Sequence, residues 1–180
     1  MSHLTAPCAL LAALAVIPAA SGHEHKRDKA PRRRPGASAS SRRLIPKTRI
    51  PDTRKNRAVI AVVEAYRRAM VRRDAKALAR LAHPAYHDDA GTPAPHDDID
   101  RRQLLRTLRT RLGALRSVDY RIACRKVGWP RPTRAEIDAS ISATYELALP
   151  GGGSRRLRHQ DRNRFVLERH RGRWLFLCGM

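Results

Sequence analysis

The sequence predicts an α+β domain over residues 58–180, in which two or three helices precede a four-stranded antiparallel meander. Two patterns carry this prediction. Up to about residue 115, apolar side chains recur at three- and four-residue spacing, which is typical of amphipathic helices. From residue 118 onward they alternate with polar side chains, as in strands that have one buried face. A chain of 180 residues is long enough for one such domain.

Two or three helices are expected before the sheet. The first runs from about Ala58 to Arg73, and its apolar stripe consists of Val59, Val62, Val63, Tyr66 and Met70. Asp74 is the predicted N-cap of a short second helix over 75–82. The acidic side chains up to Asp100 suit the positive N-terminal end of a third helix.

Four strands follow, at about 118–125, 135–147, 157–169 and 173–178. The second strand is the clearest, because its residues show seven strict alternations between apolar and polar side chains. Gly151-Gly152-Gly153-Ser154 lies between two strands, with no lysine or helix after it, so it is predicted to be a turn and not a phosphate-binding loop.

The end of the chain carries a resemblance to a known family. Asn163 to Arg169, a short turn, and Gly172 to Phe176 resemble the final strand pair of the nuclear transport factor 2-like superfamily, SnoaL-like branch. The first helices resemble the same family in Ala65 to Ala69 with Asp74 and Leu78, and so does His83-Pro84-Ala85-Tyr86. The resemblance covers about residues 58–180 and implies a cone-shaped domain, with N-terminal helices packed in a curved antiparallel sheet. It implies no particular activity, since the family contains isomerases, dehydratases, hydrolases and pure binding modules.

Strand parity predicts a ligand pocket on the inner face of this cone. An aromatic wall with a few polar groups is typical of a small-molecule site. The expected lining residues are Tyr66, Met70, Tyr120, Tyr145, Asp161, Asn163, Phe165, Trp174 and Phe176.

Asp161 is the weak catalytic candidate within this set. A carboxylate that faces an apolar cone would have a raised pKa and could act as a general base. The alternative is a carboxylate at the mouth of the cone, paired with a nearby arginine.

A metal site is considered and not favoured. The repeated His-Asp-Asp, at 87–89 and 96–98, concentrates possible metal ligands within a short stretch, together with His83 and Asp100. The spacing fits no metal-binding loop, and helix capping and arginine neutralisation account for the acids. No metal or other cofactor is therefore expected, and the sequence has no nucleophile elbow and no CxxC motif.

Residues 1–22 are expected to be a signal peptide. The run from Ala9 to Ile17 contains nine apolar residues, which is well short of the ~20 needed to span a bilayer, and small residues follow it up to Gly22. The preceding residues lack lysine and arginine, which departs from the usual pattern. Cleavage after Gly22 would give an exported protein, periplasmic or secreted; the alternative is an apolar leader that stays attached.

Residues 23–57 are expected to be a disordered basic linker rich in proline, serine and arginine. They contain 13 lysines and arginines against 3 acids, within a chain of net charge +22. This excess favours binding to a polyanion or an anionic surface through the linker. The linker lacks interleaved aromatic residues, so specific recognition of nucleic acid is not expected.

Taken together, these features predict an exported domain that binds a small, partly apolar molecule in its cone without catalysis. Two alternatives remain open. One is an isomerase or hydrolase of the same fold that uses Asp161 with a pocket tyrosine. The other is an interaction module that forms a homodimer through the outer face of its sheet and is held at an anionic surface by its tail.

Overall fold

The computed structural model describes residues 43–88 and 98–180. The predicted signal peptide, residues 23–42 of the predicted linker, Asp89 of the first His-Asp-Asp segment and His96 and Asp97 of the second lie outside these residues. No helix among the described residues is long and apolar enough to cross a membrane.

The three helices begin at capping side chains. Helix α1 (Arg54–Val71) starts after Thr53, whose hydroxyl accepts a hydrogen bond from the amide of Asn56. Helix α2 (Ala75–Leu81) starts after Asp74, which accepts from the amide of Ala77 and confirms the predicted N-cap. Helix α3 (Arg101–Gly113) starts with a reciprocal capping box between Asp100 and Gln103.

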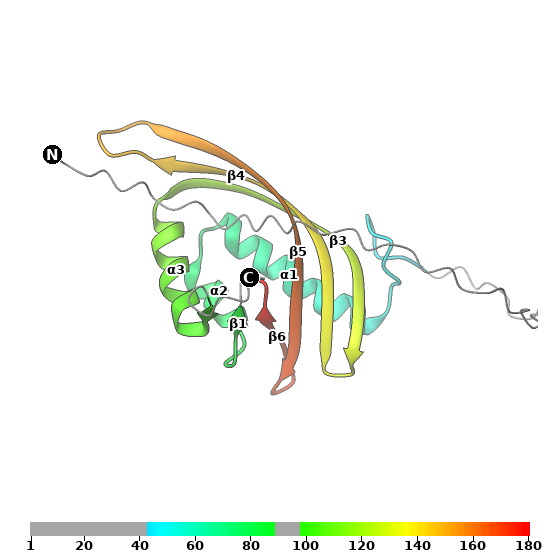
Figure 1. Cartoon of the computed structure of the whole chain (residues 1–180). Helices are drawn as coiled ribbons and strands as arrows, with labels where there is room; N and C mark the ends of the chain where they lie inside the picture. Colours follow the sequence, from blue (N-terminus) through cyan, green and yellow to red (C-terminus); the bar gives the residue numbers. More distant parts are fainter. Residues whose placement is uncertain (1–42, 89–97) are drawn as a thin grey trace, which may run out of the picture. The chain divides into compact units, whose positions relative to one another are not determined.

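The main sheet is a four-stranded antiparallel meander in the order β3-β4-β5-β6. Its strands are β3 (Leu115–Arg131), β4 (Arg134–Ala148), β5 (Ser154–His170) and β6 (Arg173–Cys178). Two very short strands, β1 (His87–Asp88) and β2 (Ile99–Asp100), pair separately. Figure 1 shows β3, β4 and β5 bending over α1, so the predicted α+β class with a curved antiparallel sheet around N-terminal helices is confirmed.

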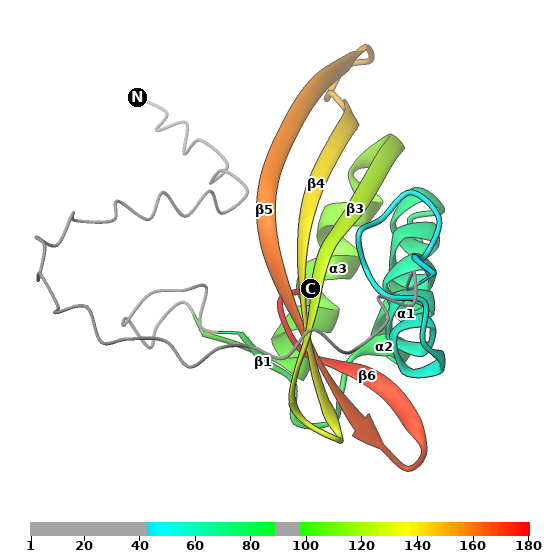
Figure 2. The same cartoon turned by 90° about the vertical axis from the view of Figure 1, so that its right-hand side faces the viewer.

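The sheet has two chemically different faces. On the concave face, which the helices cover, alternate residues of β4 are buried, from Ala135 through Ile137 to Tyr145. Their neighbours Ser140 and Ser142 point to the opposite face by the alternation of the strand. We call this opposite face, on which no described helix lies in Figure 2, the outer face. The hydrophobic core therefore lies between the concave face and the three helices.

The folded domain begins earlier than the sequence indicates. Helix α1 starts at Arg54, Leu44 pairs with Pro51, and Ile50 is only 2% exposed. Asn56 ties this segment to the sheet, because its side-chain oxygen accepts a hydrogen bond from the indole of Trp129 at 2.9 Å. The expected boundary at residue 58 differs from the structure because this anchor comes from a strand 73 residues away in sequence.

Candidate functional site

The aromatic side chains predicted to line the pocket pack against one another. The ring of Tyr66 lies 6.0 Å from that of Tyr120, 5.7 Å from Phe165 and 5.4 Å from Phe176, between centroids. Phe165 and Phe176 also contact each other at 5.4 Å, and both are fully buried. Met70 and Tyr145 belong to the same buried cluster. This part of the cone is filled by side chains.

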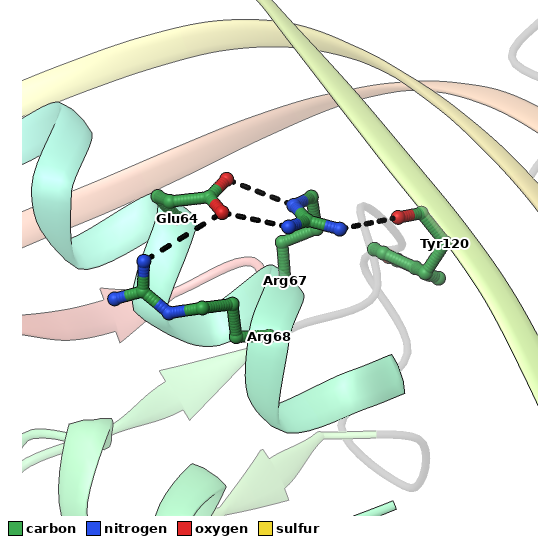
Figure 3. Close-up of polar contacts among 4 residues, drawn as sticks. All are labelled: Glu64, Arg67, Arg68 and Tyr120. Atoms are coloured by element: carbon green, nitrogen blue, oxygen red, sulfur yellow. Dashed lines mark hydrogen bonds and ion pairs between the residues drawn. The ribbon is translucent and has the colours of Figure 1, made fainter. Parts of the chain in front are cut away.

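A polar contact connects α1 with β3 beside two of these tyrosines. Arg67 donates to both carboxylate oxygens of Glu64, at 2.7 and 2.8 Å, and to the backbone carbonyl of Tyr120 at 3.5 Å (Figure 3). The hydrogen bond from Arg67 lowers the pKa of Glu64, which keeps this pair charged. The neighbouring Tyr66 then places its hydroxyl 3.5 Å from that of Tyr120.

The buried tyrosines are neutral phenols over a wide pH range. Burial raises the pKa of Tyr66 and of Tyr120, and it raises the pKa of Tyr145 to about 12. Such phenols can donate a hydrogen bond, but they are poor general bases near neutral pH because the phenolate is disfavoured.

Asp161 lies on the concave face but outside the packed cluster. It pairs in register with Ile141, which fixes its face, yet half of its side chain (50%) is exposed. One carboxylate oxygen accepts a hydrogen bond from the amide of Arg162 at 2.7 Å, and the other lies 4.0 Å from the ring nitrogen Nε2 of His159. Its surroundings are those of a rim residue.

Asn163 and Trp174 are engaged elsewhere. The side-chain amide of Asn163 donates to the carbonyl of Gly179 at 2.7 Å. Trp174 packs against Trp129 at 5.5 Å, in the region where Trp129 meets the start of α1. The nine predicted residues therefore divide into a buried core of six, Trp174, which packs against the edge of that core, and two polar residues, Asp161 and Asn163, that are not part of it.

The part of the histidine and aspartate motif that the structure describes brings one histidine and one aspartate close together. Nε2 of His87 lies 3.5 Å from a carboxylate oxygen of Asp98. Over residues 43–88 and 98–180, no three metal-ligating side chains gather into a possible cation site. No disulfide joins Cys124 and Cys178 within the same ranges.

The outer face carries two hollows that sequence reasoning missed. The larger, of about 740 Å³, is lined chiefly by Arg121, Arg125, Ser140, Ser142, Gln160 and Arg162. The smaller, of about 270 Å³, is lined by Ser117, Asp119, Thr144, Glu146, Arg156 and Arg158. The serines and threonine of β4 stand out in the sequence only as the exposed half of an alternating strand. Their arginine neighbours become visible once the strands are in register.

Comparisons with known proteins indicate a fold and no activity. No family model and no curated protein matches the chain. Among solved structures, it resembles a proposed scytalone dehydratase from Novosphingobium aromaticivorans, with 15% identity, 69% of this chain and 80% of the other covered, and a TM-score of 0.59. It also resembles a proposed dehydratase of the NTF2-like family from Streptomyces avermitilis, with 15% identity, coverage of 69% and 92%, and a TM-score of 0.57.

A third structure with the same likeness is a ketosteroid isomerase-like protein from Erwinia carotovora atroseptica, with 16% identity, coverage of 71% and 95%, and a TM-score of 0.55. Structural similarity at such low sequence identity shows that the backbones are arranged alike, and it does not show that a site has the same chemistry. The resemblance read from the sequence is thus confirmed at the level of the fold, and the chain has the nuclear transport factor 2-like fold.

Proposed function

We propose that this domain is a non-catalytic interaction module that meets its partner with the outer face of its sheet. One observation carries the proposal: aromatic rings fill the centre of the cone, whereas hollows of about 740 and 270 Å³ lie on the outer face. A binding surface needs accessible polar and charged groups, and the hollows on the outer face supply them.

The chemistry of the concave face argues in the same direction. A general base that works near neutral pH is usually a buried carboxylate with a raised pKa or a histidine placed against the substrate. The carboxylate of Asp161 is half exposed and already accepts a backbone hydrogen bond. The nearby tyrosines are neutral, and their rings pack against other side chains of the core.

Site-specific photocrosslinking in the native host tests this proposal. A photoreactive amino acid at Ser142, which is exposed on the outer face, should give a covalent adduct with a partner. The matched control is the same group at Thr110, which is exposed on α3. Equal adduct yields at the two positions, or none at Ser142, would contradict the proposal.

A second candidate is the binding, or turnover, of a small, partly apolar molecule at the wide end of the cone. The observation that favours it is the upper part of β5, where His159 and Asp161 are on the concave face and β6 no longer pairs with the strand. Native mass spectrometry of the chain purified from its host distinguishes the two. A stoichiometric small molecule that Asp161→Asn or Tyr145→Phe displaces would favour this candidate, whether it is a ligand or the substrate of an isomerase or hydrolase.

Export and surface attachment are part of the proposal. The apolar run before Gly22 supports secretion, and the basic residues after it support attachment to an anionic surface. A homodimer is a further possible form of contact through the outer face, and sedimentation of wild type against Ser142→Trp tests it.

A further inference from the structure

The two hollows of the outer face adjoin along β4. In the larger hollow, Ser142 of β4 pairs with Arg121 of β3 and with Gln160 of β5. Two residues further along β4, Thr144 pairs with Asp119 and Arg158, and these three residues line the smaller hollow. We call the combined depression the β4 groove. Its floor is a row of hydroxyl groups on β4, and its sides are side chains of β3 and β5.

Positive charge dominates the sides of the β4 groove. Its lining residues include five arginines against three acids, Asp119, Glu146 and Asp161, and the last of these lies on a strand position of the concave face. Asp119 is paired with Arg121 at 3.0 Å, and Glu146 accepts hydrogen bonds from Ser117 and Ser154. These acids are therefore already engaged and leave most of the arginine charge available to a ligand.

Two arginines, Arg125 and Arg162, flank the floor. Arg125 donates a hydrogen bond from Nε to the hydroxyl of Ser140 at 3.1 Å, which leaves its terminal nitrogens available. Arg162 lies on the opposite side of Ser140 in register. Within the described ranges, neither guanidinium lies within 4.0 Å of a carboxylate oxygen. Guanidinium groups so placed are suited to bidentate recognition of carboxylate, sulfate or phosphate.

The dimensions of the groove limit what can enter it. The arginines lie on β3 and β5, the two neighbours of β4 in the sheet. Since adjacent strands are about 5 Å apart, the two sides of the groove are separated by about 10 Å. The floor from Ser140 to Glu146 extends for about 20 Å and carries three hydroxyl groups followed by the carboxylate of Glu146. A single extended chain fits between sides at this spacing, whereas a nucleic-acid duplex would rest above them.

The chemistry of the lining distinguishes between single chains. Proteins usually hold single-stranded nucleic acid by stacking its bases on aromatic rings, and no aromatic side chain lines either hollow. The lining offers hydroxyl and amide groups between guanidiniums, which match alternating hydroxyl and acidic groups on sugars. A second copy of the domain fits the groove less well. If it docked about a two-fold axis through the larger hollow, Arg125 and Arg162 of one copy would lie against the same arginines of the other, and like charges would meet.

We infer that the β4 groove binds an extended acidic polysaccharide, with Arg125 and Arg162 on its acidic groups and Ser140, Ser142 and Gln160 on its hydroxyls. The inference rests on the proposed role of the outer face and names the chemistry of its partner. The site is separate from the predicted basic linker, because all of these residues belong to the folded sheet.

A labelled heparin octasaccharide and the full chain test the inference. The double variant Arg125→Gln and Arg162→Gln removes two charges and keeps a polar, hydrogen-bonding side chain at each position. The matched control is Arg106→Gln with Arg109→Gln, which removes two charges from exposed positions on α3. The groove variant should bind the octasaccharide about tenfold more weakly. The slope of the logarithm of the binding constant against the logarithm of the salt concentration should also become shallower, by the amount expected for about two lost ionic contacts. The control should change affinity by less than about twofold, since it loses only diffuse attraction.

Three results would overturn the inference. Equal weakening by the two variants would mean that net charge alone binds the probe. A duplex DNA of similar charge is tested in the same way. If the difference in affinity between the two variants is larger for the DNA than for heparin, the groove does not bind an acidic polysaccharide. A wild-type dimer that Ser142→Trp dissociates, and with which heparin does not compete, would assign the groove to a second copy while leaving the proposed role of the outer face intact.

Discussion

Replacing Phe176 by alanine tests directly whether the cone is filled. The Phe176 side chain is fully buried, and its ring lies 5.4 Å from those of both Tyr66 and Phe165. Truncating a buried phenylalanine costs about 3–5 kcal/mol, because burial is lost and the cavity that remains collapses only in part. We expect the upper part of this range, since the backbone carbonyl of Phe176 stays anchored by the amide of His83 and limits the collapse.

Urea denaturation followed by circular dichroism measures the effect. For a domain of this size, the same loss corresponds to a fall of about 10–20 °C in melting temperature. The control is Leu149→Ala, at a position that is 44% exposed, where the change should stay within about 0.5 kcal/mol. A loss below about 1.5 kcal/mol for Phe176→Ala would refute the packing argument.

A second measurement separates a filled cone from an open one. An apolar cavity made by truncation stays dry and can bind a small aromatic molecule such as benzene. Benzene should therefore raise the melting temperature of Phe176→Ala and leave that of the wild type unchanged. Equal stabilisation of both would show that the native cone already has room for a ligand, and the small-molecule candidate would then take precedence.

Four further predictions concern the rim, the buried phenols and the N-terminal region. Asp161→Asn should change the free energy of unfolding by no more than about 1 kcal/mol, as is typical of exposed carboxylates; a large gain in the denaturant midpoint at neutral pH would instead indicate a buried base. Burial raises the pKa of Tyr145 to about 12, so its contribution to stability should be complete below pH 10 and be lost as the pH rises from 10 toward 12, because the unfolded phenol ionises first. Tyr145→Phe should make that fall shallower in urea titrations, and an unchanged slope would contradict the assignment. Deleting residues 23–42, which carry seven lysines and arginines against two acids, should weaken retention on heparin and flatten its salt dependence; unchanged retention would assign the binding to the folded domain alone. Intact-mass measurement of protein from its host should show a chain that begins near His23, and a mature chain that keeps Cys8 would exclude this cleavage.

Local signals were sufficient for the order of the elements. Asp74 could be identified as an N-cap because its carboxylate bonds to an amide three residues away. The alternation along β4 revealed which side chains face the core because successive strand residues point to opposite faces. These features depend on neighbours within a few residues, so the sequence contains all the information that they require.

The extent to which each side chain is buried could not be predicted from such local signals. Parity correctly assigned Asp161 and Phe165 to one face, but one is half exposed and the other is fully buried. The difference arises because the rings of Tyr66 and Phe176 pack on Phe165, whereas Asp161 lies four residues further from the part of β5 that pairs with β6. The burial of Ile50 and Asn56 likewise depends on distant parts of the chain, as the bond from Trp129 to Asn56 illustrates.

The sequence by itself determined an α+β chain with helices before a meander, its caps and turns, and the face to which each strand residue points. The tertiary structure alone decided that the cone is packed with rings and that Arg125 and Arg162 flank Ser140 across three strands. The physical reason is the range of the interactions. Caps and alternation are set within a few residues, whereas packing and cross-strand register are set by bulges, turn lengths and contacts between residues far apart in the chain.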